Sequence, residues 1–80
     1  MRTDMEDRIN MVLKRVFDLT DAEVARDLRR DDIAKWDSLT HMDLVVSLEQ
    51  EFSLNFTIDE IIALDSIGRV RSILKEKGVS

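Results

Sequence analysis

The stretch WDSLTHMDLVVSLEQEF, residues 36–52, decides the fold because it carries an uninterrupted helical pattern directly behind a capping residue. With about 100° of rotation per residue, its core-facing apolar side chains fall on one arc, made of Leu44, Val45, Leu48 and Phe52. Asp37 precedes the pattern, and a carboxylate there accepts hydrogen bonds from the first-turn N–H groups and faces the positive end of the helix dipole. The stretch therefore predicts an amphipathic helix over residues 38–52, with Ser38 at its very start.

The hydroxyl of Ser38 either belongs only to the helix start or takes part in chemistry. A hydrolytic serine needs a base, a group that orients the base, and an oxyanion site. The only histidine, His41, lies three residues further along the same predicted helix, and no glycine-rich turn accompanies Ser38. Hydrolysis by a Ser38–His41 pair is therefore disfavoured. A serine at a helix start can instead be the substrate of another enzyme, because an attached phosphoryl group meets the positive end of the dipole.

Upstream of this stretch, the sequence predicts one helix and one long connection. Thr3 and Glu6 have the spacing of a capping box, and a helix over residues 4–17 follows from apolar side chains at intervals of three and four, namely Met5, Ile9, Val12, Leu13, Val16 and Phe17. Residues 18–37 keep no sustained period, so we expect a long ordered loop with a helical turn near residues 21–27. Its apolar anchors are Val24, Leu28, Ile33 and Trp36.

Downstream, the sequence predicts a short helix and a final longer one. Thr57 and Glu60 repeat the capping-box spacing before an apolar run, which indicates a short third helix. Asp65 or Ser66 can cap the fourth helix, and Gly78 can adopt the left-handed conformation that closes it. The predicted fold is an all-α, small four-helix bundle in a single domain, residues 1–80, with three longer helices, a short third helix and a long loop between helices 1 and 2.

Composition narrows the classes of function. The chain has 80 residues, 17 acidic against 12 basic side chains and a formal charge of −5, which is a poor match for nucleic acid. It has no cysteine, so a disulfide framework and a thiolate metal site are both excluded. No apolar run has the length of a membrane span or signal peptide, so we expect no membrane insertion and a cytoplasmic location. The apolar stripes suffice for one internal core, so we expect a monomer.

Four segments together resemble the acyl carrier proteins: DSL at 37–39, MDLVV at 42–46, LEQEF at 48–52 and FTID at 56–59. The resemblance covers nearly the whole chain and implies the carrier-protein type of bundle. It implies that Ser38 carries a 4'-phosphopantetheine arm, transferred from coenzyme A by a phosphopantetheinyl transferase, whose thiol holds acyl groups as thioesters. The protein is then not an enzyme. It is a substrate and carrier for acyl-activating, condensing or acyl-transfer enzymes.

The same resemblance implies a docking surface on the helix that follows Ser38. Its expected residues are Asp37, Leu39, Met42, Asp43, Val46, Glu49 and Gln50. An acidic helix face steers basic partner surfaces. Two departures weaken an assignment to primary fatty-acid synthesis: residues 34–36 lack the glycine that many fatty-acid carriers have before the motif, and Gln50 stands where an acidic residue is common. The chain is similar to carriers of fatty-acid-like, polyketide, modified-lipid or surface-polysaccharide pathways.

Several simpler interpretations stand beside this one. The principal alternative is an unmodified acidic helical adaptor that binds a protein partner through residues 38–52. For His41 and Trp36 we expect packing roles, the first partly buried and the second an anchor that clamps the long loop to the bundle. The acidic pair Asp59 and Glu60 lies in no calcium-binding loop pattern, so we expect a solvated face and no metal site there.

Overall fold

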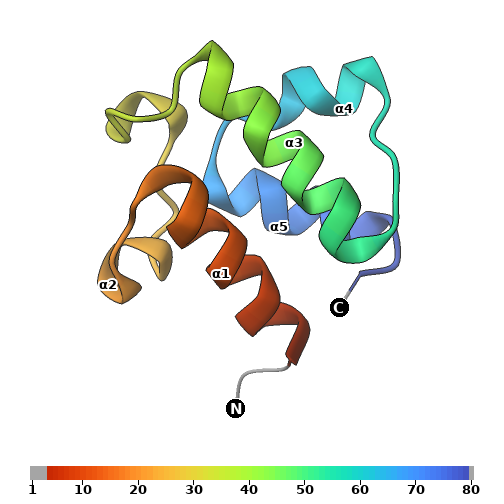
Figure 1. Cartoon of the computed structure of the whole chain (residues 1–80), viewed down its shortest axis with the longest axis horizontal. Coiled ribbons are helices and arrows are strands. Elements are labelled where there is room, and N and C mark those ends of the chain that lie inside the picture. Colours follow the sequence, from red (N-terminus) through yellow and green to blue (C-terminus); the bar gives the residue numbers. More distant parts are fainter. Residues whose placement is uncertain (1–3, 80) are drawn as a thin grey trace.

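The structure is a computed structural model that describes residues 4–79. The elements in chain order are α1 (Asp4–Phe17), α2 (Asp21–Val24), a 3-10 turn (Arg30–Asp32), α3 (Ser38–Phe52), α4 (Ile58–Ala63) and α5 (Ile67–Glu76) (Figure 1). Residues 4–79 contain no strand, and the only β-type pairing among them is an isolated antiparallel bridge between Arg29 and Ser66. The predicted all-α class is confirmed.

A helix is present at each of the four predicted places, and α1 and α3 have the predicted bounds, but the helix count differs from four. The fifth helix, α2, lies in the segment predicted as a loop, at the place where a helical turn was expected. It forms because Thr20 and Glu23 make a reciprocal capping box: the Thr20 hydroxyl accepts from the Glu23 N–H at 3.1 Å, and the Glu23 carboxylate accepts from the Thr20 N–H at 2.9 Å. The capping box expected at Thr3 lies outside the described residues.

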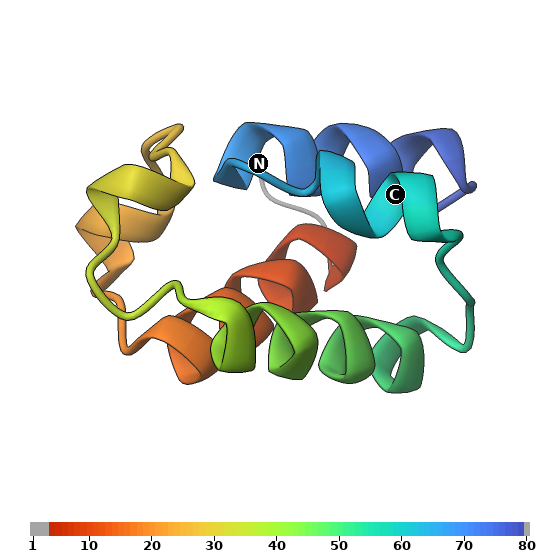
Figure 2. The same cartoon turned by 90° about the horizontal axis from the view of Figure 1, so that it is seen from above.

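The helices are arranged in two layers. Figures 1 and 2 show α1 and α3 running in opposite directions in one layer, with α4 and α5 in the other. The segment 18–37 closes one end of the molecule, and the connection from α3 to α4 crosses between the layers at the other end (Figure 2). This arrangement gives overall dimensions of 33 × 28 × 17 Å and encloses one core between the layers.

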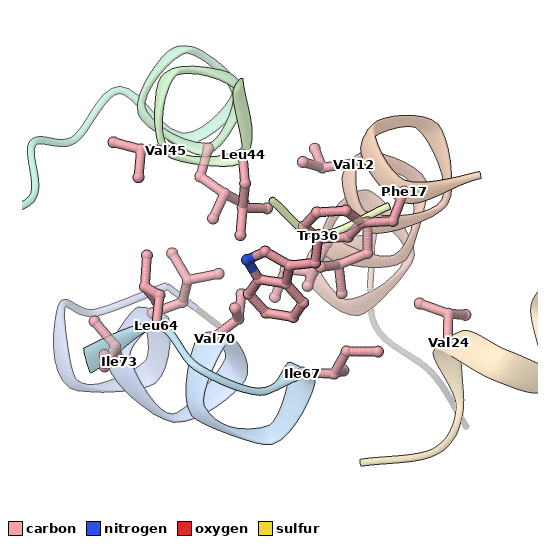
Figure 3. Close-up of a cluster of buried hydrophobic side chains, with 14 of the residues drawn as sticks. Val12, Phe17, Val24, Trp36, Leu44, Val45, Leu64, Ile67, Val70 and Ile73 are labelled. Atoms are coloured by element: carbon pink, nitrogen blue, oxygen red, sulfur yellow. The ribbon is translucent and has the colours of Figure 1, made fainter. Parts of the chain in front are cut away.

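Trp36 lies at the centre of that core. Figure 3 shows its indole between Leu44 of α3, Phe17 of α1 and Val70 of α5, and its ring stacks on that of Phe17 with 4.5 Å between centroids. Of the four predicted loop anchors, three are buried, namely Val24, Ile33 and Trp36. The fourth, Leu28, is partly buried. The loop is therefore ordered by the same apolar burial that holds the helices, at about 1.5–3 kcal/mol for each large side chain.

The arc predicted for residues 38–52 faces this core. Leu44, Val45 and Leu48 are buried, and Phe52 is partly buried beneath the guanidinium of Arg8, whose carbon lies 4.8 Å from the ring centroid. The helix ends at Phe52, and its C-cap residue, Ser53, takes the left-handed conformation with φ of 53°. The buried arc leaves the other side of α3 facing outward. No helix within residues 4–79 is long and apolar enough to cross a membrane.

Candidate functional site

The start of α3 is fixed by a reciprocal cap between Asp37 and Thr40. The Thr40 N–H donates to Asp37 Oδ1 at 2.9 Å, and the Asp37 N–H donates to Thr40 Oγ1 at 2.8 Å. The Thr40 hydroxyl itself donates to the backbone oxygen of Lys35. The predicted capping role of Asp37 is confirmed. Thr40 Oγ1 also lies 3.2 Å from Asp37 Oδ1, so its one hydrogen is shared between this carboxylate and the Lys35 oxygen. The bond from the Thr40 N–H first, and the contact with its hydroxyl second, hold the pKa of the Asp37 carboxyl below its usual value.

Ser38 takes no part in this cap. It is the first residue of α3, its side chain is exposed, and its hydroxyl makes no hydrogen bond to any other residue of the described chain. Thr40 was not recognised from the sequence, although a hydroxyl three residues after an aspartate cap was the available signal. Because Asp37 and Thr40 satisfy the helix start between them, the Ser38 hydroxyl remains open to solvent and to other molecules.

Beneath Ser38, the first turn of α3 is anchored by a chain of two buried hydrogen bonds. The Trp36 Nε1–H donates to His41 Nδ1 at 2.9 Å, and His41 Nε2 lies 2.8 Å from the backbone oxygen of Ile61 in α4. An indole nitrogen only donates and a carbonyl only accepts, so His41 carries its hydrogen on Nε2 and is neutral. His41 is only 8% exposed, which confirms its predicted packing role and that of Trp36.

This arrangement leaves His41 without a lone pair for Ser38. A general base needs a free nitrogen within hydrogen-bond reach of the proton that it removes. Both ring nitrogens are already engaged, one by Trp36 and the other by Ile61. Ser38 and His41 therefore do not form a nucleophile–base pair in this structure.

The seven residues expected to form a docking surface all lie on α3 or its cap, but they differ in exposure. Leu39, Met42 and Val46 face solvent and line a shallow, open hollow of about 390 Å³, together with Thr40 and Asp43. Asp37 and Gln50 are also exposed. The structure thus brings an exposed apolar stripe, Leu39, Met42 and Val46, next to Ser38, with the exposed carboxylates of Asp37 and Asp43 beside it.

Glu49 is the exception among the seven. It is half-buried, and its Oε2 accepts the Phe56 N–H at 2.9 Å, which ties α3 to the connection that leads to α4. The sequence did not indicate this bond, because nothing in the pattern of α3 marks Phe56 as its partner. Glu49 therefore supports the fold, and its carboxylate is already committed.

Among residues 4–79, no group of three or more histidine, cysteine, aspartate or glutamate side chains is placed to hold a metal ion. Comparison of the chain with models of known protein families finds no match, and comparison with curated proteins finds none either.

Proposed function

We propose that this protein is a carrier of the acyl-carrier type, inactive as the bare chain and functional once Ser38 bears a 4'-phosphopantetheine arm. The observation that carries the proposal is the exposed hydroxyl of Ser38, which the fold does not use, held at the start of a helix by a cap that Asp37 and Thr40 complete without it. The resemblance of residues 37–59 to carrier proteins supports the same assignment. In this proposal, the helices α1, α3, α4 and α5 form the carrier bundle and α2 is an added turn.

The arm would be attached by phosphoryl transfer at Ser38. The Oγ of Ser38 attacks the phosphorus of coenzyme A that bears the pantetheine. A new P–O bond forms to the serine, and the P–O bond to the leaving group, adenosine 3',5'-bisphosphate, breaks. The hydroxyl proton passes to a base of the transferase, since His41 has no nitrogen to spare. The helix N-terminus favours the phosphodiester anion that results.

The surroundings of Ser38 suit such a group. The side chain is exposed, so an arm there has free access to solvent, and the hollow lined by Leu39, Met42 and Val46 lies next to it. The protein's own contribution is to hold the tether and to present it, which raises the local concentration of a bound intermediate at a docked enzyme. The thiol of the arm supplies the thioester chemistry.

Incubation with coenzyme A and a broad-specificity phosphopantetheinyl transferase tests the proposal. Intact-mass spectrometry should detect the gain of one phosphopantetheine group by the wild type and none by Ser38→Ala. Ser72→Ala is the matched control, because Ser72 is also exposed on a helix and forms no hydrogen bond with its side chain in the described chain. It should gain the group as the wild type does. No mass gain by the wild type, or equal gain by Ser38→Ala, would overturn the proposal.

The alternative is an unmodified helical adaptor, and one observation favours it. Large apolar side chains that are exposed together, as Leu39, Met42 and Val46 are on α3, are typical of protein-binding faces whether or not Ser38 is modified. An adaptor predicts full function for Ser38→Ala, whereas a carrier predicts complete loss. Complementation of a deletion strain by the Ser38→Ala gene separates the two.

A further inference from the structure

The ring of His41 joins the first turn of α3 to two other parts of the fold. Its Nδ1 accepts the Trp36 Nε1–H at 2.9 Å, and its Nε2–H donates to the backbone oxygen of Ile61 at 2.8 Å. The helix that bears Ser38 is thereby tied to the end of the long loop and to α4. Both bonds lie in a site that is nearly closed to water, since His41 is 8% exposed and Trp36 is 4% exposed.

Only the neutral ring of His41 can make both bonds. Protonation places a hydrogen on Nδ1, where the Trp36 Nε1–H already points, so two donors would face each other at 2.9 Å. The indole N–H then has no acceptor in the core, and an unpaired buried donor is costly. Trp36 and the first turn of α3 can lower that cost only by moving apart. The bond to Ile61 survives, because the imidazolium still has a hydrogen on Nε2.

The surroundings of His41 do not compensate a positive charge on its ring. Within residues 4–79, no carboxylate forms an ion pair with His41. Lys35 pairs with Asp18 at 3.0 Å, and Lys77 pairs with Glu60 at 2.9 Å. The positive end of the α3 dipole also opposes a cation in the first turn. The titratable and charged groups on the elements that contact the ring are exposed or half-buried, namely Asp37 and Asp43 of α3 and its cap, Asp18 and Lys35 of the segment 18–37, and Asp59 and Glu60 of α4.

From this geometry we infer that His41 is a positioning residue whose protonation loosens the start of α3 and slows the attachment of the arm to Ser38. The inference rests on the proposed function. The neutral ring holds the first turn against Trp36 and so fixes the place of Ser38, whose oxygen must lie in line with the phosphorus that it attacks. The protonated ring stays bonded to α4 alone. Because imidazole side chains change charge between about pH 5 and pH 8, the carrier becomes a poorer substrate as pH falls through this range.

Rates of transfer from coenzyme A by a broad-specificity phosphopantetheinyl transferase, measured from about pH 8 to about pH 5, test this inference. His41→Gln is the informative variant, because a glutamine amide can accept from Trp36 and donate to Ile61 but does not titrate. The pH dependence of the transferase itself cancels in the ratio of kcat/KM between the wild type and His41→Gln. We expect this ratio to fall by more than about threefold from pH 8 to pH 5, as the neutral fraction of the ring decreases.

Asp59→Asn is the matched control for a nearby carboxylate. Asp59 is exposed on α4, two residues before Ile61, and its side chain forms no hydrogen bond or ion pair within residues 4–79. The ratio of kcat/KM between the wild type and Asp59→Asn should stay within about twofold over the same range of pH. If Asp59→Asn removed the pH dependence instead, the titrating group would be that carboxylate and the inference would be wrong.

Amide hydrogen exchange, followed by NMR, gives a local measure of the release. The N–H groups of Thr40 and His41 donate to Asp37, and the Arg69 N–H donates to Ser66 at the start of α5. After correction for the intrinsic rates, the first two should exchange more than about threefold faster at pH 5 than at pH 8 in the wild type, and the Arg69 N–H should not. In His41→Gln, none of the three should change by that factor.

Two results would overturn the inference while the proposed function stands. The first is a normal mass gain at pH 8 with a kcat/KM ratio that changes by less than about threefold down to pH 5. The second is equal acceleration of exchange at Arg69, which would show a general loss of stability in place of a local release of α3. A wild type that gains no group at pH 8 would overturn the inference and the proposed function together.

Discussion

The chain contains two Asp-Ser pairs, Asp37-Ser38 and Asp65-Ser66, and each stands at the start of a helix. The two helices use the pair in different registers. At α3 the aspartate is the cap and the serine is the first helical residue, whereas at α5 the serine is the cap. The aspartate is therefore the cap at α3, and the serine is the cap at α5.

The start of α5 is closed by the long loop. The Ser66 hydroxyl accepts the Arg69 N–H at 3.0 Å, Asp27 Oδ1 accepts the Gly68 N–H at 2.7 Å, and the backbone oxygen of Leu28 accepts the Ile67 N–H at 2.9 Å. All three of these first-turn donors are satisfied, two of them by residues some 40 positions away in sequence. The hydroxyl of Ser66 is therefore engaged by the fold as the cap of α5.

The start of α3 is open on its outer side and anchored from within. Asp37 and Thr40 complete the cap, and His41 ties the first turn to Trp36 and to Ile61. The difference teaches that the dipeptide alone does not mark a reactive serine. Ser38 is available for chemistry because the cap of α3 is completed by Asp37 and Thr40. Ser66 is not equally available, because it is itself the cap of α5.

Breaking the inner anchor of α3 should have the largest effect. His41→Ala removes the partner of the Trp36 indole N–H and of the Ile61 oxygen in the core, so both buried groups lose their hydrogen bonds and a cavity remains. We expect the free energy of unfolding to fall by about 3 kcal/mol. Urea unfolding followed by the fluorescence of Trp36, the only tryptophan, measures it. Gln50→Ala, an exposed change on the same helix, should stay within about 0.5 kcal/mol of the wild type, and equal effects would contradict the anchoring role.

The second-largest effect should come from disturbing the contact between Asp27 and the start of α5. A Cβ on Gly68 would lie 2.5 Å from Asp27 Oδ1, closer than such atoms approach, so Gly68→Ala must displace the loop carboxylate. Asp27 is exposed and its carboxylate can move aside, so the main cost is the bond from the Gly68 N–H that this movement breaks, and we expect a loss of about 1.5 kcal/mol in the free energy of unfolding.

A second variant separates this clash from other effects of the substitution. In an Asp27→Ala background the carboxylate is gone, and Gly68→Ala should then be neutral or stabilising by up to about 1 kcal/mol, because alanine favours a helix over glycine. A loss of the same size in both backgrounds would show that the approach of Asp27 is not the reason for the glycine.

The two serines give the most direct test of the comparison. Ser66→Ala removes a cap and should lower the free energy of unfolding by about 1 kcal/mol, whereas Ser38→Ala removes an unused hydroxyl and should change it by less than about 0.5 kcal/mol. Chemical denaturation of the two variants under one condition measures both. The opposite order, with Ser38→Ala the more destabilised, would mean that Ser38 supports the fold after all.

The smallest expected effect is on the stability of the protein at low pH. The pKa of Asp37 is lowered in the folded protein by its bonds from Thr40, and the pKa of Glu60 is lowered by its pairing with Lys77 and by its bond from the Thr57 N–H. A lowered pKa means that the folded state favours the carboxylate, so this stabilisation is present above the unfolded values near pH 4 and is lost as pH falls through the folded ones.

The aspartate cap of α3 should therefore weaken in acid, while the hydroxyl cap of α5 does not titrate. Asp37→Asn keeps a good cap that is neutral at every pH. Its urea midpoint should fall less steeply than that of the wild type between about pH 4 and pH 2. If the urea midpoints of the two proteins fell equally with pH, the Asp37 carboxylate would not contribute to the acid sensitivity of the fold.

The local signals in the sequence were sufficient for the helices themselves. The apolar intervals placed α1, α3, α4 and α5, and single capping residues or a capping pair marked the starts of the last three, because these signals depend on residues at most four positions apart. The buried arc of α3 and the packing of Trp36 were also predictable. The sequence left Asp65 and Ser66 as equal candidates to cap α5, because the partner that settles the register, Asp27, lies in another segment.

The place of Ser38 at the start of α3 was predictable, but the partners of the nearby carboxylates were not. Ser38 and the surrounding helix face followed from the motif, but the commitment of Glu49 to Phe56 and of Glu51 to Arg8 depends on how segments pack in three dimensions. That packing gives Glu49 and Glu51 partners within the fold and leaves Asp37 and Asp43 exposed beside Leu39, Met42 and Val46. Long-range contacts of this kind leave no periodic trace in a single sequence.

The central claim is best tested on the protein as its own cells make it. Purified protein should be cleaved after glutamate, which separates Ser38 from Ser66 because Glu49, Glu51 and Glu60 lie between them, and the peptides should be analysed by mass spectrometry. The account predicts a phosphopantetheine group on the peptide that contains Ser38 and none on the peptide that contains Ser66. A bare Ser38 peptide from cells in which the protein is active, or the group on any other residue, would contradict it.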